Sequence, residues 1–224
     1  MAKIRRLLPV IILIVSIFLA AGAFAQSADE AIKLLKEGNA RFAVMKMQYP
    51  DLDTARRVSV AVQGQKPFAA VLGCSDSRVP VELIFDRGIG DIFVIRVAGN
   101  VVIGPAVIGS AEYAAEDLGV PVLVVMGHTG CGAGKAAISA APMDGSMRDI
   151  TEKMQISVDR VKSEHPELKD VALENAVIKA NVLQGKRDLL SASEELRKLT
   201  DKGKLKILTA VYDMETGLVE WISE

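Results

Sequence analysis

The residues of this sequence that are best suited to chemistry are two cysteines and a histidine that follow short apolar runs. Cys74 comes directly after the run Phe68 to Gly73, and Cys131 stands three positions after His128, which follows the run Val120 to Gly127. The chain has no other cysteine. Two thiolates and one imidazole form a ligand set suited to zinc, and three protein ligands leave a fourth position for water, as catalytic zinc sites do.

A disulfide bond is the competing interpretation of the two cysteines, because two cysteines in an exported protein usually pair. The neighbours argue against it: Asp76 and Arg78 follow Cys74 closely, and a disulfide has no use for them or for His128. Away from a metal, the Asp76–Arg78 pair would be a surface salt bridge worth at most about 1 kcal/mol. Zinc content and a count of free thiols would separate the two interpretations.

Three short apolar runs predict the strands that must position these residues. They extend from Phe68 to Gly73, from Ile92 to Val97 and from Val120 to Gly127, and each is bounded by Gly, Pro or Asp. The segment Pro105 to Leu118, between the second and third runs, suits a tightly packed helix. Strands separated by helices imply a parallel, right-handed α/β sheet, which binds ligands at the carboxyl ends of its strands. Both cysteines stand at such ends.

The remaining elements complete an α/β fold, with a mostly parallel central sheet flanked by helices and an antiparallel edge strand at the C-terminus. Ser27 and Glu30 can form a capping box for a first helix, in which Ile32, Leu35, Asn39 and Phe42 share one face. The other predicted elements are helices at Asp53 to Val62, Met147 to Lys162 and Leu168 to Leu199, and a closing hairpin of strands at Lys206 to Tyr212 and Leu218 to Ile222.

The composition excludes some classes of protein, and the amino-terminal residues predict where in the cell the protein is found. The chain has 27 basic and 28 acidic residues and is half apolar, which excludes a disordered chain and a polybasic nucleic-acid binder. Residues 1–25 begin with basic side chains, continue through an apolar run and end in Ala23-Phe24-Ala25. This pattern predicts a signal peptide cleaved after Ala25 and a periplasmic protein, with an uncleaved membrane anchor as the alternative. Residues 26–224 show no repeat or linker and predict a single domain.

Two motifs resemble those of a known enzyme family. Cys74-Ser75-Asp76-Ser77-Arg78 and His128-Thr129-Gly130-Cys131-Gly132 are similar to the metal motifs of the β-class carbonic anhydrases, zinc-dependent lyases that interconvert carbon dioxide and bicarbonate. The similarity continues through Gly38-Asn39-x-Arg41-Phe42, Gly64-Gln65-x-Pro67, Arg96-x-Ala98-Gly99-Asn100 and Glu112-Tyr113-Ala114. It therefore covers nearly the whole chain after Ala25.

The resemblance implies that Cys74, His128 and Cys131 hold one zinc ion per chain, with water or Asp76 as the fourth ligand. Zinc-bound hydroxide would then hydrate carbon dioxide to bicarbonate and a proton. Arg78 would hold Asp76 off the metal so that Asp76 orients the hydroxide; both the open and the closed arrangement occur in the family. Two thiolates already cancel the charge of the metal, so the bound water should be less acidic than in a three-histidine site and activity should rise on the alkaline side.

The resemblance also implies a substrate pocket and an oligomer. Gln65 would donate a hydrogen bond to a substrate oxygen, and Phe93 and Tyr113, with Ala98 beside them, would line an apolar pocket for carbon dioxide. In this family the pocket is built across a dimer interface, which implies a homodimer or a higher even oligomer.

Other functions fit the sequence less well. The glycine-rich segment from Gly130 to Lys135 lacks a phosphate loop's first glycine and its final Ser or Thr, since Thr129 and Ala136 stand there. A related enzyme that hydrolyses carbon disulfide or carbonyl sulfide would share the motifs. An exported metal-binding or disulfide-stapled protein without turnover is the non-enzymatic alternative. His165 belongs to a segment that we expect to be an exposed loop. Because the only other histidine, His128, is assigned to the metal, we expect the proton to leave through water and buffer.

Overall fold

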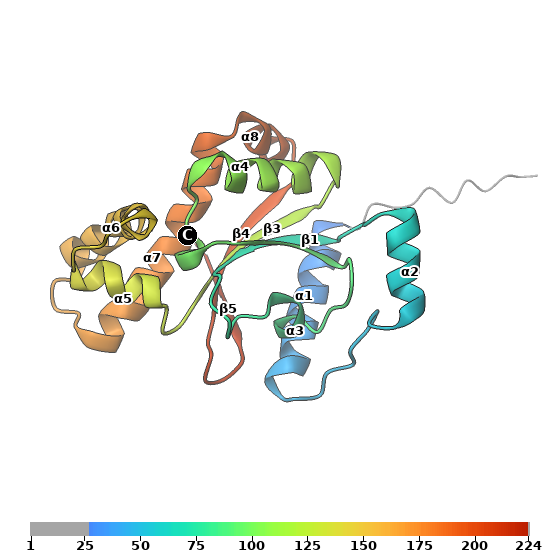
Figure 1. Ribbon diagram of the computed structural model, residues 1–224, viewed down its shortest axis with the longest axis horizontal. Coiled ribbons are helices and arrows are strands. Elements are labelled where there is room, and N and C mark those ends of the chain that lie inside the picture. Colours follow the sequence, from blue (N-terminus) through green and yellow to red (C-terminus); the bar gives the residue numbers. More distant parts are fainter. Residues whose placement is uncertain (1–26, 224) are drawn as a thin grey trace, which may run out of the picture.

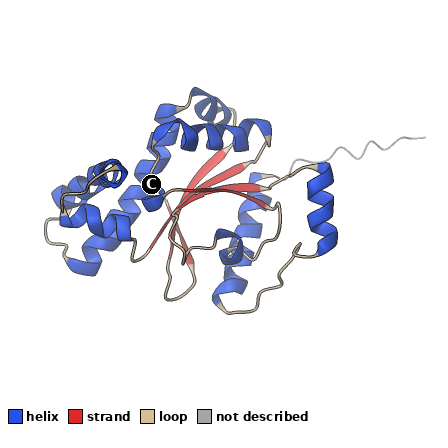
Figure 2. Cartoon of the chain, viewed as in Figure 1, coloured by secondary structure: helices blue, strands red, loops and turns tan. Residues whose placement is uncertain are grey.

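A five-stranded sheet runs through the chain, and helices cover both of its faces (Figures 1 and 2). The computed structural model describes residues 27–223. The predicted signal peptide lies outside these described residues, so export stays a prediction. Within residues 27–223, every helix is too short or too polar to cross a lipid bilayer.

The sheet places β1 (Ala69–Gly73) and β3 (Val122–His128) side by side in its interior. The strand order is β2-β1-β3-β4-β5, in which β2 (Ile92–Arg96) is one edge and β4 (Lys206–Tyr212) and β5 (Val219–Ile222) lie on the other side. Only the β4–β5 pair is antiparallel. The predicted mostly parallel sheet with an antiparallel C-terminal edge is therefore confirmed.

Alternate residues of the two central strands enter different apolar cores. Leu72 and Val125 pack on one face of the sheet, and Val71 and Val124 pack on the other, which is why both strands are continuous apolar runs. The first face is covered by α4 (Gly104–Glu112), α7 (Asp170–Ala192) and α8 (Glu194–Asp201), and the second by α1 (Ala28–Ala43) and α3 (Val81–Ile84).

Three further helices lie beside the sheet. The core of the first face extends to α5 (Gly132–Ser139) and α6 (Ser146–Glu164). In contrast, α2 (Thr54–Gln63) stands at the opposite end of the molecule and buries none of its residues in the part of the chain described (Figure 1).

A local cap and a π-helical turn divide two of the predicted helices. The predicted helix from Leu168 to Leu199 is two helices, because Ser193 is extended and its Oγ accepts the Leu196 N–H at 3.1 Å as the N-cap of α8. The predicted helix from Pro105 is α4 followed by a π-helical turn at Tyr113–Asp117. At the first helix, Ser27 Oγ accepts the Glu30 N–H at 3.2 Å, which confirms Ser27 as the predicted cap.

Candidate metal centre

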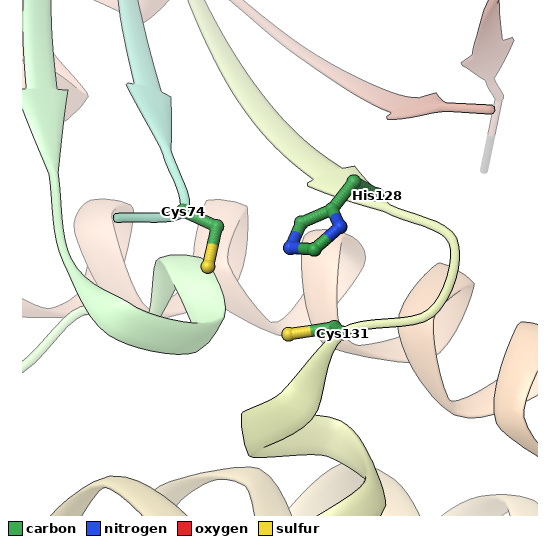
Figure 3. Close-up of side chains that lie close together, drawn as sticks. All are labelled: Cys74, His128 and Cys131. Atoms are coloured by element: carbon green, nitrogen blue, oxygen red, sulfur yellow. The ribbon is translucent and has the colours of Figure 1, made fainter. Parts of the chain in front are cut away.

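The two cysteines and the histidine meet at the carboxyl edge of the sheet. Cys74 directly follows β1, His128 is the last residue of β3, and Cys131 is the N-cap residue of α5. Because β1 and β3 are parallel neighbours, their carboxyl ends lie together. One ligand atom from each of the three residues lies within 4.8 Å of the others, and the side chains point toward a common centre (Figure 3).

Both sulfurs are buried free thiols, so the structure contains no disulfide between them. A hydrogen bond between the sulfurs lowers the pKa of the Cys74 thiol and raises that of the Cys131 thiol. The pair releases its first proton readily and holds the second, because two neighbouring buried thiolates repel each other. A cation between them removes that repulsion and allows both to be thiolates.

The imidazole of His128 is set up as the third ligand. Its Nδ1 donates to the Thr129 carbonyl at 3.0 Å, a contact that assigns the proton to Nδ1 and leaves a lone pair on Nε2. Nε2 is buried and has no hydrogen-bond partner among the described residues. An unpartnered acceptor of this kind is costly unless something binds it. Together with the two sulfurs, Nε2 fits a zinc ion.

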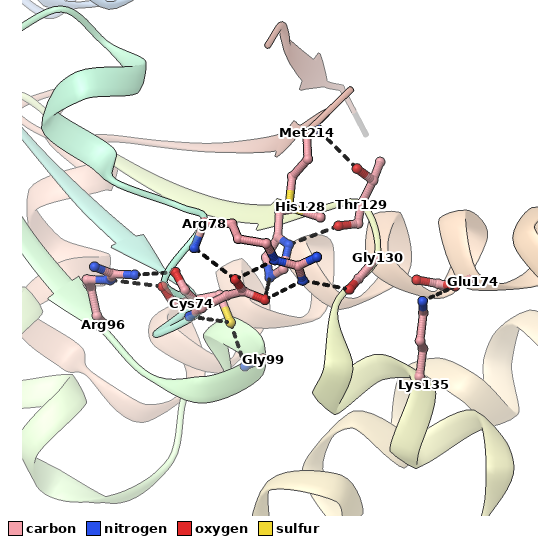
Figure 4. A network of polar contacts seen from close by, with 11 residues as sticks. Cys74, Arg78, Arg96, Gly99, His128, Thr129, Gly130, Lys135, Glu174 and Met214 are labelled. Carbon is pink, nitrogen blue, oxygen red and sulfur yellow. Dashed lines mark hydrogen bonds and ion pairs between the residues drawn. The ribbon is translucent and has the colours of Figure 1, made fainter. Parts of the chain in front are cut away.

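Thr129 ties the ligand loop to the neighbouring strand. Its backbone N–H donates to the Tyr212 carbonyl at 3.0 Å. Its Oγ1 accepts the Met214 N–H at 3.1 Å (Figure 4). Both partners lie at the end of β4 or directly after it. Sequence reasoning did not identify this contact, because it joins residues far apart in the chain.

Asp76 and Arg78 form a two-pronged ion pair beside the three ligands. Arg78 Nε and Nη2 donate to the two carboxylate oxygens at 2.9 and 2.7 Å. These hydrogen bonds hold the pKa of the Asp76 carboxyl well below its usual range, against the opposing effect of partial burial. Asp76 Oδ2 is 3.9 Å from His128 Nε2, and Arg78 Nη2 also donates to the Gly130 carbonyl at 3.2 Å. Arg78 thus bridges both ligand loops and engages both oxygens of the Asp76 carboxylate.

Arg96 fixes the loop that carries Cys74 and Asp76. Its Nε donates to the Cys74 carbonyl at 3.0 Å and its Nη2 to the Asp76 carbonyl at 2.6 Å (Figure 4). In the sequence Arg96 stands out only as part of the motif Arg96-x-Ala98-Gly99-Asn100, which indicates no role for it. Its position at the carboxyl end of β2, adjacent to β1, was the available signal.

The predicted pocket residues are partly assembled in one chain. Phe93 and Tyr113 lie in contact, with ring centroids 5.9 Å apart. Ala98 precedes Gly99, whose N–H reaches Cys74 Sγ at 3.2 Å. Gln65 is exposed and precedes the amino end of β1, whereas Cys74 follows the carboxyl end. At about 3.3 Å per residue, this strand alone puts roughly 15 Å between them, so the chain does not bring Gln65 to its own metal centre.

The two histidines have different surroundings. His128 is buried among the ligands, whereas His165 lies at the end of α6 with its side chain about half exposed, 3.6 Å from Glu167. This placement agrees with the exposed loop expected for His165.

Comparison with known proteins relates both the sequence and the fold to one family. A family model described as carbonic anhydrase matches residues 69–219. Carbonic anhydrase 2 of Mycobacterium tuberculosis is 50% identical over 133 residues, which cover 57% of this chain and 63% of that protein. The chain thus spans less than two thirds of the length of this relative. The carbonic anhydrase of Pseudomonas aeruginosa is 36% identical over 70% of this chain and 73% of its own length.

Solved structures show the same fold. One of the tetrameric β-carbonic anhydrases from the filamentous ascomycete Sordaria macrospora superposes with a TM-score of 0.71 at 24% identity. The match covers 76% of this chain and 88% of the fungal chain. The family model also spans the sheet edge that carries Cys74 and His128, because its match begins at the first residue of β1 and ends in β5.

Proposed function

The chain belongs to the β-class carbonic anhydrase family, and from this premise we propose that it catalyses the reversible hydration of carbon dioxide to bicarbonate and a proton with one zinc ion per chain. The observation that carries the proposal is the unpartnered Nε2 of His128, buried beside two free thiols and flanked by the Asp76–Arg78 pair. A purely structural zinc site needs no such ion pair beside an open fourth position.

Zinc held by Cys74, His128 and Cys131 would supply a hydroxide nucleophile near neutral pH by lowering the pKa of a water molecule. The chain's own residues would hold the zinc ion and orient the nucleophile. The Asp76 carboxylate is ionised, because Arg78 keeps its pKa low, and it can accept a hydrogen bond from the attacking nucleophile. Accepting that bond would turn the nucleophile's lone pair toward carbon dioxide. Arg78, which donates to the Gly130 carbonyl and to both Asp76 oxygens, would keep Asp76 from moving onto the metal.

The proton released in each turnover leaves through water and external buffer in this proposal. His128 is committed to the metal, and His165 lies on a surface loop at the end of α6. The proposal also includes export to the periplasm, which rests on the sequence of residues 1–25 alone.

Stopped-flow hydration of carbon dioxide from pH 6 to 9, with zinc per chain determined on the same sample, tests the proposed function. We expect turnover with about one zinc per chain and a rate that rises on the alkaline side. Bound zinc without turnover would refute carbon dioxide as the substrate, and the same sample would then be assayed with carbon disulfide and carbonyl sulfide. Absence of zinc with both thiols oxidised would refute the metal site.

We further propose that the active unit is a homodimer in which each chain supplies Gln65 to its partner's metal centre. The segment from Val44 to α2 exposes apolar side chains and carries Gln65 at its end. The exposed large apolar residues of this segment are Val44, Met45, Tyr49, Leu52, Val58 and Val62. A second copy of the chain would cover them and would place Gln65 where its own chain does not.

The orientation of this projecting segment is fixed before any partner binds. The buried carboxylate of Asp86 accepts Arg41 Nε at 2.6 Å and the backbone N–H groups of Gln48 and Tyr49. Arg56 of α2 pairs with Asp91 at 2.8 Å. These contacts fix the segment against Asp86 and Asp91, so little conformational entropy would be lost when a second copy docks.

A mixed dimer distinguishes a Gln65 that acts across the interface from one that acts within its chain. We expect Gln65→Ala to lower hydration at least about 10-fold, because a donor to the reacting oxygens is lost. Differently tagged Gln65→Ala and Cys131→Ser chains are co-expressed, and the doubly tagged dimer is isolated. If Gln65 acts across the interface, one of the two sites is intact and about half of the wild-type activity returns. Activity at the level of the separate variants, or a monomer by light scattering, would contradict the proposal.

A further inference from the structure

Cys74 differs from a simple thiol ligand because its sulfur accepts backbone hydrogen bonds. The Gly99 N–H donates to Cys74 Sγ at 3.2 Å in a buried environment, and the Asp76 N–H donates at 3.4 Å (Figure 4). An N–H donor draws charge away from a thiolate and fixes the direction of its remaining lone pairs. Such contacts adjust both the strength and the orientation of a metal ligand.

Gly99, whose N–H reaches the sulfur, has a left-handed backbone conformation, with φ of 68° and ψ of 11°. Glycine adopts this conformation without steric cost. A Cβ at this position would lie 2.8 Å from Met154 Sδ and 3.1 Å from Ala133 Cβ. The short 3₁₀ turn Ala98–Asn100 is therefore shaped by close packing against α5 and α6.

Asn181 holds this turn from the opposite side. It projects from α7, is 5% exposed, and donates Nδ2 to the Gly99 carbonyl oxygen at 2.9 Å. A buried amide is retained at low cost only when it is hydrogen-bonded, and a carbonyl that loses its donor is left unpaired. The contact spans 82 residues of sequence, and it fixes the residue whose N–H touches the metal-ligand sulfur.

We propose that Asn181 is a positioning residue for the metal centre: it holds Gly99 so that the Gly99 N–H stays on Cys74 Sγ, which limits the charge that this sulfur donates to the metal. The inference rests on the proposed function, since the ion concerned is the zinc of that proposal. Among residues 27–223, Asn181 makes no hydrogen bond to the three ligand side chains or to the Asp76–Arg78 pair, and it acts through Gly99.

Cobalt substitution of Asn181→Leu tests the proposal with a signal that comes from the sulfur itself. Leucine has the same branching and the same number of side-chain heavy atoms as asparagine but no donor, so Gly99 loses its anchor. We expect the thiolate-to-cobalt charge-transfer band to move to lower energy, because a sulfur without its N–H donor gives up an electron more easily. Zinc affinity, measured by competition with a chelator, should fall about 10- to 100-fold, as it does when groups that orient a ligand are lost.

Leu189→Ala is the matched control, since it opens a cavity in the same helix at a fully buried position two turns away. It should lower the melting temperature and leave the band and the zinc affinity unchanged. Asn181→Ala, which cannot overpack the site, serves if Asn181→Leu does not fold. An unshifted band in the folded Asn181 variant, or an equal shift in Leu189→Ala, would overturn the proposal. Neither readout needs catalysis, so a wild-type protein that binds metal without hydrating carbon dioxide would refute the proposed function alone.

Discussion

Replacing Cys131 with serine should remove both the zinc and the hydration activity. Cys131 is one of three ligands, and the oxygen of serine is a poor substitute for a thiolate on zinc. Loss of a group that merely orients a ligand costs about 10- to 100-fold in metal affinity, so loss of a ligand should cost more than about 100-fold. Turnover should fall to the rate of the uncatalysed reaction. Zinc per chain after dialysis against a chelator and stopped-flow hydration measure the two effects.

The control for this variant lies on the same helix. Lys135→Ala removes an exposed side chain of α5 whose contact with Glu174 is 3.8 Å long, and it should keep full zinc and full activity. The metal-free wild-type protein gives the melting temperature expected for a folded chain without zinc. Full zinc occupancy in Cys131→Ser would contradict the ligand assignment, because two of the proposed ligands would then suffice.

The sequence predicted the sheet and the clustering of Cys74, His128 and Cys131 well, because both depend on local patterns. β1 and β3 are buried on both faces, and such strands appear as unbroken apolar runs between turn residues. Their carboxyl ends then determine where Cys74 and His128 must lie. The same logic identified the Asp76–Arg78 pair, since both residues belong to one turn and their contact is local.

The groups that support the ligands could not be predicted in the same way. Arg96 contacts Asp76 from 20 residues away and Asn181 contacts Gly99 from 82 residues away, and no periodicity encodes such contacts. The break at Ser193 is a local cap, in which its Oγ accepts the Leu196 N–H, but a serine is also compatible with a continuous helix, so its presence alone does not mark the boundary. Gln65 illustrates a different limit. A motif places it in the family's site, but only the fold shows that it lies far from its own chain's metal centre.

Asp76→Asn should keep the zinc and lose most of the turnover. The amide has the shape of the carboxylate but less capacity to accept a hydrogen bond, and Arg78 no longer has a negative partner to hold. We expect hydration to fall about 100-fold, the size of effect found when a positioned hydrogen-bonding group is removed from a reacting centre. Zinc per chain should stay at the wild-type value, because Asp76 does not belong to the cluster of three ligands.

The pH profile of this variant separates orientation by Asp76 from titration of Asp76. Arg78 holds the pKa of the Asp76 carboxyl well below its usual value of about 4, so Asp76 is ionised throughout the range from pH 6 to 9. An alkaline rise in activity therefore cannot come from Asp76, and it should persist in Asp76→Asn at a lower plateau. A variant that matched the wild-type rate at every pH would show that Asp76 orients nothing. A variant that lost the alkaline rise would show instead that this carboxylate belongs to the titrating group.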